Sequence, residues 1–138
     1  MNNKNKSKII ELGELGDERG LLTVIEENNT IPFEIKRVFY IYGTANGVRR
    51  GLHAHYKTRQ LLVAVSGKCI VTLDDTKRKT EVLLDSPKKG LLLEPNDWHE
   101  MHDFSTDCVL LVIASHLYDS EDYIRDYRNF LEVYGRGE

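Results

Sequence analysis

The sequence predicts an all-β fold, a barrel or sandwich of short strands with one helix near the C-terminal end. The chain has 138 residues, 41% hydrophobic and 30% charged, which suits one soluble domain with one core. Short apolar runs recur at nearly even spacing between turn residues, and the pattern changes only near the C-terminus. We therefore expect a single domain over residues 9–138, preceded by a disordered tail at residues 1–8.

Eight apolar runs predict the strands of this fold. Val, Ile and aromatic residues are enriched in several of them, as is typical of strands. Alternation is clearest in the fourth run, where Cys69, Val71 and Leu73 fall on one face. Gly67 separates two of the runs tightly. The predicted strands cover residues 20–27, 36–42, 59–66, 68–74, 79–85, 89–94, 98–103 and 108–114.

The stretch "DSEDYIRDYRNFLEVY", residues 119–134, has a different periodicity. Ser120 can cap a helix there. Aromatic residues then recur at spacings of three and four, at Tyr123, Tyr127, Phe130 and Tyr134. This pattern predicts a terminal helix whose aromatic side chains pack on the sheet.

Charge and composition exclude several classes of protein. The net charge of −3 does not indicate a nucleic-acid or anionic-membrane partner. No apolar run approaches the about 20 residues that span a bilayer. The stretch "MNNKNKSKII" has no apolar region of a secretory signal, so we expect a cytoplasmic protein. Cys69 and Cys108 lie in apolar runs and are predicted to be buried free thiols, although a disulfide between them stays open.

The segment "GLHAHYKTRQ", residues 51–60, holds the strongest chemical signal. Residues i and i+2 of a strand share a face, so His53 and His55 are expected to lie side by side. Two buried imidazoles would need polar partners, which a functional pocket supplies. The alternative interpretation places both histidines on the surface near a strand end.

The wider spacing around these histidines resembles a known motif. Gly47 is followed by five residues, His53-Ala54-His55, four residues, Gln60, six residues and Gly67. This resembles the first motif of the cupin superfamily, and "GLLLEPNDWHEMH" resembles the second with altered spacing. The resemblance covers about half of the chain. It implies a small double-stranded β-helix, or jelly roll, with a pocket inside the barrel.

The same motifs bear on metal binding. Gln60 stands where metal-binding cupins carry a glutamate, and a neutral amide is a poor substitute for an anionic ligand. His53, His55 and His99 could still form a site with an open position. His99 is preferred to His102 because strict alternation would let at most one of them face the interior. We favour a pocket without metal or cofactor, in which one histidine acts as acid or base near neutral pH.

A more specific resemblance runs from about residue 17 to residue 131. It is carried by "DERGLLTVIEE", "IPFEIKRVFYIY", "RRGLHAHYKTRQLLVAVSG", "EPNDWHEMHDFSTDCVLLVIAS" and "YDSEDYIRDYRNF". These segments look like the sugar-nucleotide 3,4-ketoisomerases, which act on dTDP-4-oxo-6-deoxyglucose in deoxyamino-sugar biosynthesis. The resemblance implies a metal-free homodimer with exchanged N-terminal strands. It also implies an isomerase that moves the keto group from C4 to C3 through an enediol.

The resemblance implies catalytic roles for three residues. His53 matches the catalytic histidine of the family. His55 matches its neighbour, which either completes a proton relay or orients the first ring. Tyr40 matches the active-site tyrosine and is expected to donate to a substrate oxygen, which we favour over its alternative as a core aromatic in "RVFYIY".

The substrate implied by the resemblance, a dTDP-linked 4-oxo-6-deoxy sugar, sets further requirements. Its diphosphate carries about two negative charges and requires cationic side chains, although any one arginine could be an ordinary surface charge. Gln60 would reach a sugar hydroxyl if a turn brings it to the histidine face. Trp98 would line the pocket or simply pack. The predicted substrate-binding residues are Arg19, Arg37, Arg50, Gln60, Trp98 and His99.

The sequence leaves two other functions open. A dTDP-sugar epimerase uses related proton abstraction in the same type of barrel, but with a histidine–aspartate pair and a tyrosine acid. A non-catalytic cupin would only bind a sugar nucleotide or metal. The sequence also leaves open whether the 3-oxo product has the galacto or gluco configuration at C4.

Overall fold

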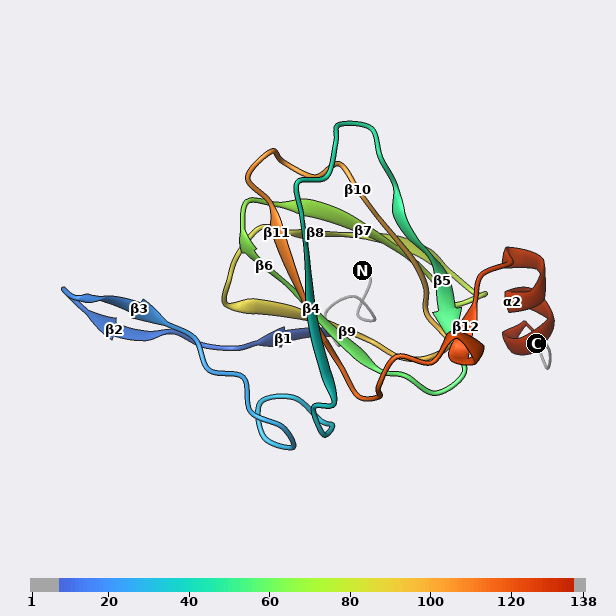
Figure 1. Ribbon diagram of the computed structural model, residues 1–138, viewed down its shortest axis with the longest axis horizontal. Helices are drawn as coiled ribbons and strands as arrows, with labels where there is room; N and C mark the ends of the chain where they lie inside the picture. The colour runs from blue at the N-terminus through green and yellow to red at the C-terminus, as the bar shows by residue number, and fades with distance from the viewer. Residues whose placement is uncertain (1–7, 136–138) are drawn as a thin grey trace.

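Two antiparallel sheets of five strands each face one another in the computed structural model, which describes residues 8–135 (Figure 1). In order across the first sheet lie β1 (Ile9–Glu11), β9 (Lys89–Leu93), β6 (Gln60–Ser66), β11 (Val109–Ala114) and β4 (Arg37–Tyr42). In order across the second lie β12 (Tyr123–Ile124), β5 (Arg50–His55), β10 (Trp98–His102), β7 (Cys69–Asp74) and β8 (Lys79–Leu84). The predicted all-β fold with a C-terminal helix is confirmed.

Strict alternation along the strands produces the core. In β6, Leu62 and Ala64 point into the cluster between the two sheets, whereas Leu61 and Val63 belong to a second cluster on the outer side. The segment before β4 covers this outer side with Ile31 and other apolar residues. A third cluster lies beneath the C-terminal helix. Such double-sided burial explains why β6 has a continuous apolar run instead of an alternating one.

Seven of the eight predicted strands form within two residues of their expected bounds. The exception is the run 20–27, of which only β3 (Gly20–Leu22) is a strand. It pairs with β2 (Leu15–Asp17) in a hairpin that projects away from the barrel (Figure 1). The sequence prediction also missed β1, β2 and β5 as separate strands, because the first two are only three residues long and β5 is interrupted by glycine.

The predicted helix 119–134 is wrong in its first half. Residues Ser120–Asp122 form a 3₁₀ turn, Tyr123–Ile124 pair with β5 as β12, and α2 spans Tyr127–Tyr134. The Asp126 side chain accepts a hydrogen bond from the backbone N–H of Arg128, so the helix begins only after this cap. Tyr123 and Ile124 therefore form a strand with β5, although the spacing of the aromatic residues is typical of a helix.

Asp122 holds the connection between β5 and β6. Its buried carboxylate accepts hydrogen bonds from the backbone N–H groups of Tyr56 at 3.2 Å and Lys57 at 2.8 Å, and from the hydroxyl of Thr58. This turn restores Gln60 to the face on which the histidines lie. The condition that the sequence set for Gln60 is thus met.

The predicted N-terminal tail lies mostly outside the described residues, and the cysteines lie where the sequence predicts. Residues 1–7 of the predicted tail lie outside the described residues, whereas Lys8 forms an ion pair of 2.5 Å with Asp97. Cys69 and Cys108 are buried free thiols, as predicted, and burial raises the pKa of Cys69 to about 12. No helix within residues 8–135 is long and apolar enough to cross a membrane.

Candidate active site

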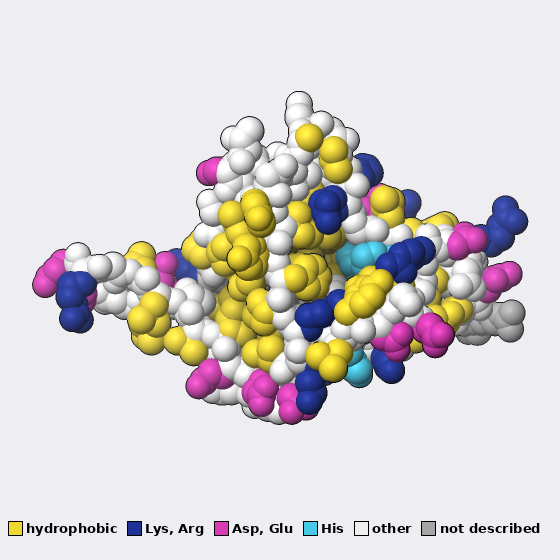
Figure 2. Space-filling view, in the orientation of Figure 1, with side chains coloured by type: hydrophobic (Ala, Val, Ile, Leu, Met, Phe, Trp, Pro, Cys, Tyr) yellow, Lys and Arg dark blue, Asp and Glu magenta, His cyan; other side chains and the backbone are white. Residues whose placement is uncertain are grey.

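A small cavity of about 120 Å³ lies between the two sheets. Four of the predicted site residues line it, namely Arg50, His53, Gln60 and His99. Its other lining residues are Phe39, Ile41, Gly51, Leu62, Met101, Val112 and Tyr123. The space-filling view shows histidine at the bottom of a hollow with basic side chains nearby (Figure 2). Mostly apolar walls around a few convergent polar groups are typical of a small-molecule site.

A bulge in β5 aims His53 into this cavity. The pairing of β5 with β10 shifts register between His99 and Glu100, and Gly51 and Leu52 have φ angles of +85° and +63°. A Cβ atom on Gly51 would lie 3.0 Å from the His99 carbonyl oxygen. Glycine is therefore required here both for its backbone conformation and for the close approach of the two strands.

Backbone carbonyls fix the protonation of two histidines. The Nδ1 atom of His53 lies 3.0 Å from the Gly51 carbonyl oxygen, and that of His99 lies 3.1 Å from the Asp97 carbonyl oxygen. A carbonyl oxygen only accepts hydrogen bonds, so each Nδ1 carries the proton. Each neutral ring consequently keeps its lone pair on Nε2, which makes that atom an acceptor or a base.

The three histidines form a compact cluster. The ring centroid of His53 lies 5.0 Å from that of His55 and 4.6 Å from that of His99. Burial, followed by the neighbouring His99, lowers the pKa of His53 to about 2 and that of His55 to about 3. Burial also lowers the pKa of His99. All three rings are therefore neutral at pH 7.

Tyr123 and two arginines border the cluster. The Tyr123 ring lies 4.9 Å from His53 and 4.7 Å from His55, and its hydroxyl is 3.5 Å from Nη2 of Arg37. The Arg125 guanidinium lies 4.2 Å above the same ring. His55 Nε2 and Arg37 Nε are buried without a hydrogen-bond partner among the described residues. Such atoms mark unused polar capacity beside the cavity.

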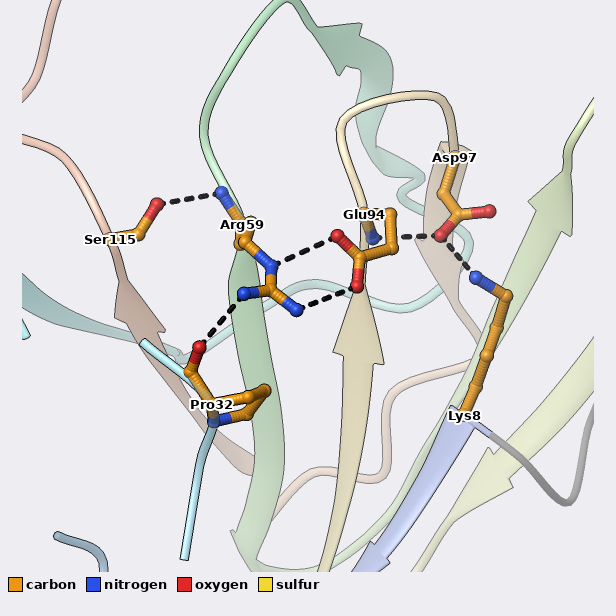
Figure 3. A network of polar contacts seen from close by, with 6 residues as sticks. All are labelled: Lys8, Pro32, Arg59, Glu94, Asp97 and Ser115. Atoms are coloured by element: carbon orange, nitrogen blue, oxygen red, sulfur yellow. Dashed lines mark hydrogen bonds and ion pairs between the residues drawn. The ribbon is translucent and has the colours of Figure 1, made fainter. Parts of the chain in front are cut away.

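A network of polar contacts supports the cavity from the side of β6 and β9 (Figure 3). Arg59 makes two hydrogen bonds of 2.9 Å to the Glu94 carboxylate and one of 2.8 Å to the Pro32 carbonyl oxygen. The Asp97 carboxylate accepts a hydrogen bond of 2.8 Å from the Glu94 N–H and forms an ion pair with Lys8. Because the backbone carbonyl of Asp97 also accepts a hydrogen bond from Nδ1 of His99, this network fixes one wall of the site.

Two predicted site residues, Tyr40 and Trp98, lie away from the cavity in this chain. Tyr40 is 61% exposed on the outer face of β4, because alternation places Phe39 and Ile41 inside. Trp98 is buried beneath the C-terminal helix and contacts Tyr127 and Phe130. Neither side chain lines the cavity of this chain, and the roles of Tyr40 in proton donation and of Trp98 in substrate binding stay predictions.

Arg19 also lies away from the cavity, at the tip of the β2–β3 hairpin. Its side chain is 86% exposed and pairs with Asp17 at 2.7 Å. Arg37 is closer to the predicted function, since it borders the cluster through Tyr123. A single chain therefore brings Arg37 and Arg50 to the site and leaves Arg19 outside it.

The remaining histidines have other surroundings. The Nδ1 atom of His102 lies 2.8 Å from the Asp103 carboxylate, and its Nε2 atom lies 2.7 Å from the Thr72 hydroxyl. His116 lines a separate open groove of about 750 Å³ on the exterior. That groove shares no described lining residue with the cavity and contains none of the clustered histidines.

Sequence reasoning missed Tyr123 and Arg125. The aromatic spacing predicts a helix that includes Tyr123, because Tyr123 shares the spacing of the aromatic residues that follow it. Asp126 was the available signal, since an aspartate before "YRNF" is a good helix cap and would have placed both missed residues before the helix.

The described residues contain no group of three His, Cys, Asp or Glu side chains suited to hold a metal ion. Gln60 lines the cavity, and its neutral amide is a weaker metal ligand than a carboxylate would be at the same position. Function without a metal or cofactor stays a prediction.

Comparison with known proteins adds independent information. The TDP-4-oxo-6-deoxy-α-D-glucose-3,4-oxoisomerase of Aneurinibacillus thermoaerophilus is 53% identical over 91% of this chain and 90% of that protein. The 3,4-ketoisomerase of Helicobacter canadensis has 41% identity and a TM-score of 0.90 over 93% of this chain and 96% of its own. A mutant 3,4-ketoisomerase of Thermoanaerobacterium thermosaccharolyticum, solved with TDP-4-keto-6-deoxyglucose, has 38% identity and a TM-score of 0.91, with 93% of each chain covered.

A more distant likeness concerns the fold alone. The dTDP-6-deoxy-D-glucose-3,5-epimerase of Legionella pneumophila has 19% identity and a TM-score of 0.72, over 84% of this chain and 70% of that chain.

The family model described as WxcM-like, C-terminal (FdtA) matches residues 5–135, nearly the whole sequence. With the identity to the Aneurinibacillus protein, this match shows that the chain belongs to the FdtA family.

Proposed function

We propose that this protein is a 3,4-ketoisomerase that converts TDP-4-oxo-6-deoxyglucose into its 3-oxo isomer. The observation that carries the proposal is His53, a neutral ring with a free Nε2 lone pair at a cavity inside the barrel. The 53% identity to a named 3,4-oxoisomerase supports the reaction and the substrate.

The chemistry needs a base at C3 and charge stabilisation at the oxygens. The C4 carbonyl acidifies the C3 hydrogen, and His53 Nε2 removes that hydrogen to give an enediol. Returning the proton to C4 completes the isomerisation. His55, next to His53 and buried, orients the ring or relays its proton.

Cationic side chains border the site and suit the substrate diphosphate. Arg50 lines the cavity, and Arg37 and Arg125 flank Tyr123. Guanidinium groups bind phosphate oxygens with paired hydrogen bonds. Gln60, buried at the cavity wall, offers an amide to a sugar hydroxyl.

The direct test is incubation with TDP-4-oxo-6-deoxyglucose followed by NMR assignment of the product. The proposal expects the carbonyl at C3, and the same spectrum reports the configuration at C4. An epimerase would instead invert C3 and C5 and leave the carbonyl at C4. A non-catalytic binding protein would bind the sugar nucleotide and return it unchanged.

The reaction is proposed to need no metal. Exhaustive chelation, checked by elemental analysis, is expected to leave the rate unchanged. Loss of activity that one specific ion restores would contradict this part of the proposal. We also propose a cytoplasmic location, which suits the two buried free cysteines.

A homodimer with exchanged N-terminal hairpins is the proposed assembly. The hairpin exposes Leu15, Leu21 and Leu22, with Leu21 68% exposed. The outer face of β4, at the edge of the first sheet, exposes Val38, Tyr40 and Tyr42 (Figure 2). Docking the hairpin of one copy onto the sheet of another would cover both apolar surfaces and the open edge.

This assembly also gives Arg19 a route to substrate. In one chain Arg19 lies at the hairpin tip, so it serves the predicted binding role only if the hairpin reaches a second copy's cavity. Analytical ultracentrifugation at micromolar concentration is expected to give a dimer. A monomer under those conditions would contradict the exchange.

A further inference from the structure

We propose that Tyr123 carries the oxygen-bound proton of the isomerisation, while His53 carries the carbon-bound one. This inference rests on the proposed 3,4-ketoisomerase function and adds a catalytic residue to it. It follows from the proton balance of the reaction and from the groups that surround the cavity.

Moving a keto group from C4 to C3 relocates two protons. The C3 hydrogen is lost and C4 gains one, and the hydroxyl proton on O3 is lost while O4 gains one. His53 Nε2 accounts for the carbon-bound proton. A second group with an exchangeable proton must serve the two oxygens.

The cavity wall offers few candidates for the second group. His53 and His99 donate from Nδ1 to backbone carbonyls, so both present an acceptor on Nε2. Gln60 and Arg50 donate hydrogen bonds but do not give up protons at neutral pH. Of the described lining residues, only Tyr123 carries a hydroxyl. Alternation along β4 places Phe39 at the wall and turns Tyr40 outward.

The surroundings of Tyr123 suit a phenol that ionises briefly. Its hydroxyl lies 3.5 Å from Nη2 of Arg37, and Arg125 lies 4.2 Å above its ring. Two cations close to a phenolate stabilise its negative charge. Arg37 Nε, buried without a partner in the described part of the chain, leaves this guanidinium further capacity to bind a polar group.

The two proton transfers then balance. His53 Nε2 takes the C3 proton, the C3–H electrons form the C3=C4 bond, and the C4 carbonyl electrons move to O4, which takes the Tyr123 proton. The Tyr123 phenolate next removes the O3 proton. The O3–H electrons form the C3 carbonyl, and the C3=C4 electrons take the proton from His53 at C4. Both side chains return to their starting states.

The test compares Tyr123→Phe with Tyr56→Phe, an exposed tyrosine outside the cavity. Loss of a general acid lowers the rate by about 10²- to 10⁴-fold. We expect this fall in kcat for Tyr123→Phe, with substrate affinity by titration calorimetry changed less than tenfold. Tyr56→Phe is expected to keep wild-type kcat.

Hydrogen exchange separates catalysis from a structural role. In D₂O, Tyr123→Phe is expected to slow C3 hydrogen exchange, because O4 takes the Tyr123 proton in that step. It is expected to slow product formation still more, because the Tyr123 phenolate also removes the O3 proton. Equal loss of both, or wild-type kcat, would overturn the assignment. If wild-type protein forms no 3-oxo product, the proposed function fails instead.

A second substitution covers the case in which Tyr123→Phe does not fold. Tyr123→3-fluorotyrosine preserves the ring and lowers its phenol pKa. The alkaline limb of the kcat profile is expected to move to lower pH. An unchanged profile in an active, folded variant would also overturn the assignment.

Discussion

The cavity and the N-terminal hairpin differ in the kind of group that each leaves without a partner in the described chain. At the cavity, the unpartnered atoms are buried and polar, His55 Nε2 and Arg37 Nε. On the hairpin, the uncovered side chains are apolar, Leu21 and Leu22. A polar ligand would complete the first region and an apolar surface the second. The candidate active site and the proposed assembly surface therefore differ in the chemistry of what would cover them.

The strongest test of the cavity is His53→Asn. Asparagine keeps some polarity and bulk but cannot act as a base. The rate is expected to fall by about 10²- to 10⁴-fold, the usual effect of losing a general base. Titration calorimetry should show nearly unchanged affinity, since the arginines remain. His102→Asn, outside the cavity, is the matched control and should keep most of the activity.

The β-bulge can be tested at Gly51. Gly51→Ala places a methyl group 3.0 Å from the His99 carbonyl oxygen and shifts two histidines, so we expect at least a tenfold loss of kcat. Gly43→Ala is the control, because Gly43 has a similar φ of +67° but nothing within 4 Å of its Cβ position. Both substitutions should lower the free energy of unfolding by about 1–2 kcal/mol. Equal activity in the two variants would show that the bulge does not aim His53.

The hairpin responds to a different substitution. Changing Leu21 and Leu22 together to Asp places charges on the proposed interface. Each buried leucine contributes about 1.5–3 kcal/mol, so the dimer dissociation constant should rise at least about 100-fold. Sedimentation velocity measures this shift. A dimer as tight as wild type would place the interface elsewhere.

The cavity also predicts a stability that depends on pH between 5.5 and 7.5. An unfolded histidine titrates near 6.5, whereas burial lowers the pKa of His53 to about 2. Between these values the unfolded chain binds more protons, so the free energy of unfolding falls as the pH drops below 6.5. His53 alone contributes up to about 1.4 kcal/mol per pH unit. Urea unfolding at pH 7.5 and 5.5 should show a smaller difference in His53→Asn, and an equal difference would refute the linkage.

The smallest expected effect concerns the support of the cavity wall. Lys8→Met leaves the buried Asp97 carboxylate without its ion pair. We expect a loss of about 1–2 kcal/mol in the free energy of unfolding, since Lys8 is partly exposed and Asp97 keeps its hydrogen bond from Glu94. Lys36→Met, at an exposed ion pair with Glu34, should change stability by less than about 0.5 kcal/mol. Equal effects would show that the Lys8 contact contributes little.

Local sequence rules predicted the parts of the site that depend on one strand. His53 and His55 share a face because they are two residues apart, and their rings do lie 5.0 Å apart. Tyr40 illustrates the limit, because alternation groups residues by face but does not say which face is inside. Tyr123 illustrates another, because pairing with β5 depends on a segment nearly 70 residues earlier. Long-range strand pairing and register determine which face of β4 lies inside and place Tyr123 in a strand, and the local pattern alone does not reveal either.

Exchange of the substrate C3 hydrogen in D₂O tests the central assignment most directly. Wild-type protein and His53→Asn are mixed with TDP-4-oxo-6-deoxyglucose, and loss of the C3 proton signal is followed by NMR. Because His53 Nε2 is the proposed base, exchange should be fast in the wild type and nearly absent in the variant. Exchange at the wild-type rate in His53→Asn would contradict the assignment and give the base to another residue of the cluster.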